Sequence, residues 1–182
     1  MKRSVILSLL ILLLSACSHV EKNSVQDYLA LAPAEVNIQA QERVQALKKL
    51  YDQLEDGLLE QQIVETYAEK LYFNDTLVTL HDRQSLLRYL KHTQQQLDDI
   101  KFDILDIENN GQDSYVRWLM QTRFRVMGQD LDIHSIGMSH LRFDAAGKII
   151  LHQDYWDSMQ GFYYHLPLIG GILQWIKNGL YD

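Results

Sequence analysis

The feature that most constrains the fold of this chain is a change from helical to strand periodicity near residue 97. From there to residue 156, apolar and polar residues alternate with a period of two, as in strands with one buried face. The segments predicted as strands are Ile100–Glu108, Ser114–Met127, Leu131–Phe143 and Lys148–Trp156. The turn sequences between them are Asn109–Gly111, Gly128–Asp130 and Asp144–Gly147. The pattern therefore predicts consecutive antiparallel strands joined by short turns.

The part of the chain before these strands is predicted to be mainly helical. Apolar side chains recur at helical spacing over Val44–Leu54 and again over Ile63–Leu71. A short strand is expected over Thr76–His81, and Asp82 is placed to cap a third helix that carries Leu86–Leu97. Helices followed by an antiparallel meander predict an α+β fold, in which a curved antiparallel sheet wraps around the helices packed on it.

The N-terminal residues look like the signal sequence of a bacterial lipoprotein. Leu14–Cys17 resembles a lipobox and ends a ten-residue apolar run, Val5–Leu14, which follows Lys2 and Arg3. A membrane span is the alternative, but ten residues cover about 15 Å, roughly half of a bilayer core. Cys17 is the only cysteine, so it has no internal disulfide partner. We expect acylation of Cys17, with a signal peptide over 1–16, a tether over 17–38 and one domain over 39–182.

The charge of the chain excludes some partners. The sequence has 17 basic and 24 acidic residues, a formal net charge of −7, and removal of Lys2 and Arg3 with the signal peptide makes it more negative. Nucleic acids and anionic headgroups would be repelled, so the acyl groups on Cys17 would provide the membrane contact. Ser18 follows Cys17, whereas an aspartate at this position would retain a lipoprotein at the inner membrane in enteric bacteria. The expected location is therefore the cell envelope, at the outer membrane and facing the periplasm.

Several motifs between Gln39 and Trp175 resemble one known superfamily. They are Leu71–Asp75, Tyr115–Trp118, Ser139–Asp144, Gly147–Ile149 and His152–Asp157. Together they are similar to the SnoaL-like branch of the nuclear transport factor two-like, or ketosteroid-isomerase-like, superfamily. The resemblance implies a cone-shaped, cystatin-like α+β domain with a pocket between sheet and helices, often a homodimer through the outer face of the sheet. Members include isomerases, cyclases, epoxide hydrolases and binding modules, so fold alone does not select a reaction.

Asp154 is the main candidate for chemistry. Strand alternation places it on one face with His152 and Trp156. By resemblance to limonene epoxide hydrolases, Asp154 matches a catalytic aspartate, and His152 is a tentative second catalytic residue. A carboxyl group in an apolar pocket can work as an acid or base near neutral pH.

The other groups of the two known mechanisms are missing. The tyrosine and asparagine of the hydrolases fall at Val78 and Leu80, and their arginine and second aspartate at Val116 and Trp118. The general base of the ketosteroid isomerases also falls near Leu80, and their oxyanion-hole acid falls near Ser139. Leucine is no base, and serine is a weaker donor.

Bulky side chains are predicted to surround Asp154. Trp118 and Trp156 are expected beside a ligand pocket, with Ser139 and Leu80 at the positions aligned above. Tyr67 and Tyr72 could add to the lining, with simple core packing as the favoured alternative for both. The expected ligand is small and apolar.

The histidines do not predict a metal site. His134 and His140 share a strand face but would lie about 20 Å apart. His140 and His152 could approach across strands, yet no acidic or cysteine ligand completes a pattern. His81 and Asp82 could form an acid–base pair, with a helix cap beside a solvated histidine as the favoured alternative. We expect no metal and no cofactor.

The segment Tyr163–Ile176 is too apolar for a free tail and too short for a membrane span. A short helix after Pro167 could close the cone or pack on a sister subunit, and insertion into the bilayer is the alternative. Two functional classes remain. The preferred one is binding of a small apolar ligand or a protein partner without catalysis, and the other is an isomerase-, cyclase- or epoxide-hydrolase-like enzyme that uses Asp154.

Overall fold

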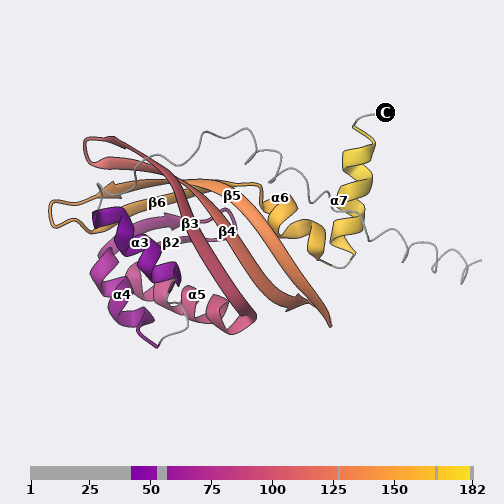
Figure 1. The fold of residues 1–182 in the computed structure, drawn as a ribbon, viewed down its shortest axis with the longest axis horizontal. Coiled ribbons are helices and arrows are strands. Elements are labelled where there is room, and N and C mark those ends of the chain that lie inside the picture. The colour runs from indigo at the N-terminus through magenta and orange to yellow at the C-terminus, as the bar shows by residue number, and fades with distance from the viewer. Residues whose placement is uncertain (1–41, 53–56, 127, 167, 181–182) are drawn as a thin grey trace, which may run out of the picture. The chain divides into compact units, whose positions relative to one another are not determined.

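The computed structural model describes residues 42–52, 57–126, 128–166 and 168–180 (Figure 1). The helices and strands of one compact unit are α3 (Glu42–Asp52), α4 (Leu59–Thr66), β1 (Tyr67–Asn74), β2 (Thr79–Asp82), α5 (Arg83–Gln96), β3 (Leu97–Asn110), β4 (Asp113–Val126), β5 (Gln129–Phe143) and β6 (Ile149–Trp156). A separate unit contains α6 (Ser158–Gly161), η2 (Tyr163–His165) and α7 (Ile169–Asn178). The α+β class predicted from the sequence is confirmed. Cys17, the signal peptide and the tether lie outside the described residues.

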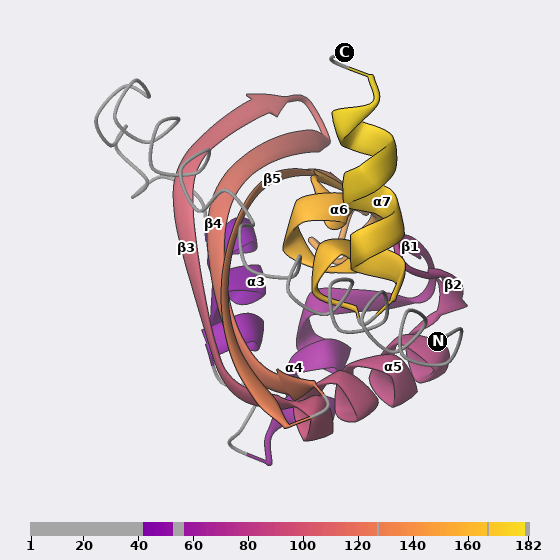
Figure 2. The same cartoon turned by 90° about the vertical axis from the view of Figure 1, so that its right-hand side faces the viewer.

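The sheet has six strands in the order β2-β1-β6-β5-β4-β3. The meander from β3 to β6 is antiparallel, as its turn sequences predicted. One pair differs from the expected antiparallel arrangement, because β1 runs parallel to β6 and the sheet is therefore mixed. The reason is that β6, the last strand of the meander, pairs with β1, which comes much earlier in the sequence. Figure 2 shows β3, β4 and β5 curving around α3.

The boundary between α4 and β1 corrects the second predicted helix. Helical spacing continued to Leu71, but α4 ends at Thr66 and Tyr67 is already extended, with φ −112° and ψ 146°. Pairing of β1 with β6 and β2 gives the backbone of this segment its hydrogen bonds, and Leu71 and Phe73 are buried. Tertiary pairing thus overrides a weak local preference for helix.

The short strand that follows also begins later than predicted. It was expected from Thr76, whereas β2 covers Thr79–Asp82. The Asp75 carboxylate accepts hydrogen bonds from the backbone N–H groups of Leu77 and Val78 at 3.0 and 2.9 Å. This side-chain contact stabilises a turn where the sequence pattern indicated a strand.

Asp82 caps α5, as predicted. Its carboxylate accepts hydrogen bonds from the backbone N–H and the hydroxyl of Ser85, both at 2.8 Å. Leu97, expected in the helix, is the first residue of β3. The turn glycines Gly111 and Gly147 have φ of 64° and 77°, in the left-handed region that favours glycine.

The core lies between the helices and the concave face of the sheet. On β4 the predicted alternation is seen at Val116 and Trp118, which are buried, while Tyr115 is exposed. Other fully buried side chains come from the helices, from β1, from β3 and from the last two strands: Leu47, Leu50, Ile63, Tyr67, Phe73, Leu86, Phe102, Leu141, Phe143, Ile149 and His152. This face of the sheet holds the polar groups described below.

The C-terminal unit contains a short helix after position 167, as expected from the sequence. Within this unit a Cβ atom at Gly170 would lie 2.1 Å from the carbonyl oxygen of Tyr164, so only glycine allows α7 to approach η2. Leu168, Ile172 and Trp175 are largely exposed on this unit. Among the described helices, none is long and apolar enough to cross a bilayer. What covers these side chains stays a prediction.

Candidate functional site

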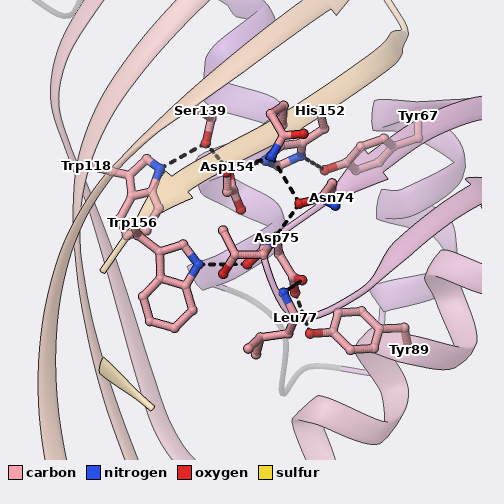
Figure 3. Close-up of polar contacts among 12 residues, drawn as sticks. Tyr67, Asn74, Asp75, Leu77, Tyr89, Trp118, Ser139, His152, Asp154 and Trp156 are labelled. Carbon is pink, nitrogen blue, oxygen red and sulfur yellow. Dashed lines mark hydrogen bonds and ion pairs between the residues drawn. The ribbon is translucent and has the colours of Figure 1, made fainter. Parts of the chain in front are cut away.

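Strand register brings the candidate residues into adjacent rows on the concave face. Ser139 of β5 pairs with Asp154 of β6, and Gly137 pairs with Trp156 on one side and Trp118 on the other. Figure 3 shows the side chains of Trp118, Ser139, Asp154 and Trp156 on this face of the three strands. The sequence placed Asp154 and Trp156 on one face, and the register adds the neighbours from β4 and β5.

A buried hydrogen-bond chain runs from Trp118 to Asp154. The indole Nε1 of Trp118 donates to Ser139 Oγ at 2.9 Å, and Ser139 Oγ donates to Asp154 Oδ1 at 2.5 Å. Trp118, Ser139 and Asp154 are 3%, 1% and 7% exposed. An indole nitrogen can only donate, so the serine hydroxyl must accept from it and pass its own proton toward the aspartate.

A second chain reaches the same oxygen from β1. The Tyr67 hydroxyl lies 2.7 Å from His152 Nδ1, and His152 Nε2 lies 2.8 Å from Asp154 Oδ1. Tyr67 and His152 are fully buried. Burial, and next the charge of Asp154, hold the pKa of Tyr67 well above its usual value, so its hydroxyl keeps the proton.

The tautomer of His152 follows from these contacts. Within the described residues the Tyr67 hydroxyl has no acceptor other than Nδ1, and a buried hydroxyl hydrogen without an acceptor is costly. Tyr67 therefore donates to Nδ1, and Nε2 carries the proton that His152 donates to Asp154. Both chains converge on Oδ1, which accepts from a serine and a histidine.

The second carboxylate oxygen of Asp154, Oδ2, belongs to neither hydrogen-bond chain. No described residue forms a hydrogen bond with Oδ2, and 9% of the side chain remains exposed. Trp156, two residues further along β6, is half-buried on the same face, and its indole nitrogen donates to the carbonyl oxygen of Asp75 at 2.7 Å. Two fixed indoles thus lie near a carboxylate whose outer oxygen is available to a ligand (Figure 3).

Gly137 was not singled out from the sequence, although the site depends on it. A Cβ atom at this position would lie 2.3 Å from the indole of Trp118, closer than any side chain tolerates. The glycine lets the Trp118 ring lie across β5 and reach Ser139. A glycine in the middle of a predicted strand was the available signal, because it marks a close approach.

Asp75 and Tyr89 form a further pair that sequence analysis missed as part of the site. The Tyr89 hydroxyl donates to Asp75 Oδ2, and burial, followed by the charge of Asp75, raises the pKa of Tyr89. The turn that holds Asp75 contains Thr76 at φ 73°, an unusual conformation for a β-branched residue. The helical pattern of α5 placed Tyr89 on that helix but gave no reason to join it to the turn.

Tyr51 of α3 also belongs to this region. Its ring stacks on Phe102 with 4.7 Å between centroids, and the residue is 8% exposed. Burial is the largest cause of its raised pKa, followed by the nearby Tyr67, Asp154 and Asp75. No described residue forms a hydrogen bond with its hydroxyl. The sequence assigned Tyr51 only to a helix face.

Three predicted residues lie outside the network. Tyr72 donates to Gln153 Oε1 at 3.1 Å, and Gln153 points away from Asp154 by strand alternation. Leu80 is half-buried and packs against the core from β2. His81 is exposed with its ring 5.9 Å from that of Tyr72, while Asp82 caps α5, so the two do not form an acid–base pair.

The remaining histidines have separate surroundings. His140 lies 2.9 Å from Asp113, and His134 lies 3.3 Å from Asp132. His152 pairs only within the buried chain. In the part of the chain that the structure describes, no group of histidine, cysteine and acidic side chains is arranged to hold a metal.

Comparison with solved structures places this arrangement in a known fold. A protein classed as a SnoaL-like polyketide cyclase from Shewanella denitrificans is 17% identical, with a TM-score of 0.56, over 65% of this chain and 92% of that one. A hypothetical protein with a ketosteroid-isomerase-like fold from Catenulispora acidiphila, in complex with trimethylamine, is 14% identical, with a TM-score of 0.56, over 66% and 88%. An LEH-like epoxide hydrolase from M. tuberculosis is 15% identical, with a TM-score of 0.53, over 78% and 97%. At these identities the likeness concerns the fold.

Sequence comparison gives the family itself. A search of curated protein sequences gives no match. The SnoaL-like domain, in contrast, matches residues 47–152, which include α4, α5 and the strands up to His152. The resemblance inferred from the motifs is thereby confirmed, and the chain belongs to the SnoaL-like domain family.

Proposed function

We propose that the domain binds a small, largely apolar ligand that donates one hydrogen bond to Asp154, without chemical turnover. The observation that carries this proposal is the convergence of both buried chains on Oδ1, which leaves Oδ2 as the free acceptor. Trp156, which is half-buried, would supply apolar contact area beside it, while the buried Trp118 holds Ser139 in place. The ligand class follows from these groups, because an aromatic surface with one fixed polar atom favours apolar molecules with a single donor.

Two features favour binding over catalysis. Both nitrogens of His152 are occupied by protein groups, so its ring cannot take a proton from a ligand. The positions that the resemblance gives to a general base and an oxyanion-hole acid hold Leu80 and Ser139. The Catenulispora acidiphila protein, which has this fold, was solved in complex with the small organic molecule trimethylamine, and this supports ligand binding in the fold.

Native mass spectrometry of the full chain, released from its own host's membranes, tests the binding function. We expect a small molecule to remain bound to the wild-type protein and to be lost or reduced in Asp154→Asn. Asp103→Asn is the matched control, because Asp103 is exposed on β3 and carries the same charge. A wild-type protein that carries no ligand, and binds none from host lipid extracts, would contradict the proposal.

An enzyme is the second candidate, and one observation favours it. Oδ2 of Asp154 is in place to accept a proton from a substrate and return it, while His152 and Ser139 stabilise the carboxylate through Oδ1. Isomerase, cyclase or epoxide-hydrolase activity on a hydrophobic substrate would then be abolished by Asp154→Asn with folding unchanged. Turnover of the molecule identified by mass spectrometry, followed by chromatography, distinguishes this candidate from simple binding.

We also propose that acyl groups on Cys17 anchor the protein in the envelope, at the outer membrane and facing the periplasm. The support is the lipobox-like segment Leu14–Cys17 and the acidic net charge of −7, which disfavours attachment through anionic headgroups. Fractionation of Cys17→Ser tests it. We expect the variant to leave the membrane fraction, and a variant held as tightly as the wild type would show that acylation is not the anchor.

We also propose that two copies of the chain form a homodimer through the outer face of the sheet. Met138 of β5 and Tyr155 of β6 are paired across the strands and 42% and 56% exposed, and Tyr115 of β4 is 37% exposed. Apolar side chains gathered on one sheet face are typical of protein contacts. A second copy of the chain is the expected partner, because a twofold axis lets one such patch cover itself.

A further inference from the structure

Asp154 has no cationic partner among the described residues. Its one contact with an ionisable group is with His152, whose ring lies between the Tyr67 hydroxyl at Nδ1 and Asp154 Oδ1 at Nε2. No described Lys or Arg forms an ion pair with it. Buried carboxylates in proteins are normally paired with a cation, because hydrogen bonds alone recover only part of the lost hydration.

A second polar group of the same region, the hydroxyl of Tyr51, has no hydrogen-bond partner among the described residues. Tyr51 is 8% exposed, and none of the described residues forms a hydrogen bond with its hydroxyl. The charges that act on it are those of Asp154 and Asp75, together with the hydroxyls of Tyr67 and Tyr89. Neither Oδ2 of Asp154 nor the Tyr51 hydroxyl thus has a hydrogen-bond partner among the described residues, and each is free to bond a ligand.

The surroundings of these groups are electronegative and aromatic. Asp154 and Asp75 both raise the pKa of Tyr89 and of Tyr51, and no cation contributes to either shift. The indoles of Trp118 and Trp156 lie beside Asp154 (Figure 3). Carboxylates and aromatic ring faces both attract positive charge, and their combination is how proteins bind organic ammonium groups.

Resting on the ligand-binding function proposed above, we propose that the ligand is a protonated amine with apolar substituents. Its N–H group donates to Oδ2 of Asp154, and its substituents lie against the half-buried indole of Trp156. The ligand nitrogen supplies the positive charge that the described chain does not provide. A neutral alcohol would satisfy the hydrogen bond but leave the buried charge unpaired, and an anion would be repelled.

Three probes of nearly the same size separate charge from shape. N,N-dimethylbenzylamine is cationic at neutral pH, isobutylbenzene replaces its nitrogen with a CH group, and 1-phenyl-2-propanol offers a neutral donor. Their affinities are measured on the full chain in lipid nanodiscs, by NMR of the indole N–H groups. We expect the amine to bind at least about tenfold more tightly than either neutral probe.

Asp154→Asn supplies the second comparison. The asparagine carbonyl can still accept from Ser139 and His152, while its NH₂ group replaces Oδ2 and offers a donor to the ligand. We expect amine affinity to fall by about thirtyfold or more, with little change for isobutylbenzene. Asp103→Asn in the same nanodiscs controls for partition into lipid and for net charge, and should bind the amine as the wild type does.

The outcomes separate this inference from the function on which it rests. If a neutral probe binds the wild type as tightly as the amine, the amine class is wrong while an apolar ligand site remains. If no probe binds at millimolar concentration, both proposals fail. If Asp154→Asn does not fold, the comparison of amine and isobutylbenzene on the wild type alone decides, since only charge and its hydrogen bond distinguish the two.

Discussion

At the scale of single residues, Ser139 has two roles in the buried chain. It accepts the indole proton of Trp118 and donates to Asp154, so its loss leaves a buried N–H group without a partner. We predict that Ser139→Ala lowers the free energy of unfolding by about 1–3 kcal/mol, measured by urea denaturation. Ser135→Ala, a half-buried position on the same strand, is the control and should change it by less than about 0.5 kcal/mol. If both variants lose the same unfolding free energy, the hydrogen-bond chain from Trp118 to Asp154 contributes nothing specific to stability.

Tyr67 makes stability depend on alkaline pH. Its pKa is raised in the folded protein above the unfolded value of about 10, so the unfolded chain loses this proton first as pH rises. The stabilisation from the neutral phenol is full below about pH 10 and is lost as pH rises toward the folded pKa. We predict that Tyr67→Phe flattens the fall of unfolding free energy between about pH 10 and 11, by roughly 1.4 kcal/mol per pH unit. An unchanged slope in urea denaturation would contradict this role.

At the scale of secondary structure elements, β5 tests the packing of the site through Gly137. A methyl group there would occupy the position of the Trp118 ring, which must turn away and lose its bond to Ser139. We predict that Gly137→Ala costs about 1–3 kcal/mol of unfolding free energy and shifts tryptophan fluorescence. Gly171→Ala is the matched control, since a Cβ atom there meets nothing within 4 Å. If Gly171→Ala lowers the unfolding free energy as much as Gly137→Ala, the loss of glycine flexibility explains the effect rather than contact with the Trp118 ring.

The elements also show what the sequence could predict. Turn glycines and two-residue alternation were sufficient for β3 to β6, because both signals are local. The boundary of α4 and β1 was wrong because Tyr67 pairs with a strand that lies far along the chain. For the same reason alternation placed Asp154, His152 and Trp156 on one face, but could not supply the register that sets Ser139 opposite Asp154. Tyr51 and Tyr89 reach the site through helix packing, for which the sequence pattern gives a face but no partner.

At the scale of the assembled protein, the outer face of the sheet is the surface that we propose for the contact between two copies. Met138 and Tyr155 face each other across β5 and β6, and their apolar surface is exposed in a single chain. Contact between two copies would remove this surface from water at both patches at once, because a twofold axis brings each patch against its equivalent. A charge introduced there is buried twice in the dimer and not at all in the monomer, so it opposes assembly without opposing folding.

We therefore predict that the wild-type chain sediments as a dimer and that Met138→Glu sediments as a folded monomer, with the circular dichroism spectrum of the wild type. Analytical ultracentrifugation of the full chain in matched detergent measures both. Val64→Glu is the control, because Val64 is 45% exposed on α4, away from the sheet face. It adds the same charge and should leave the dimer intact. A wild-type monomer would exclude this face as an interface, and a dimer that survives Met138→Glu would move the contact to another surface.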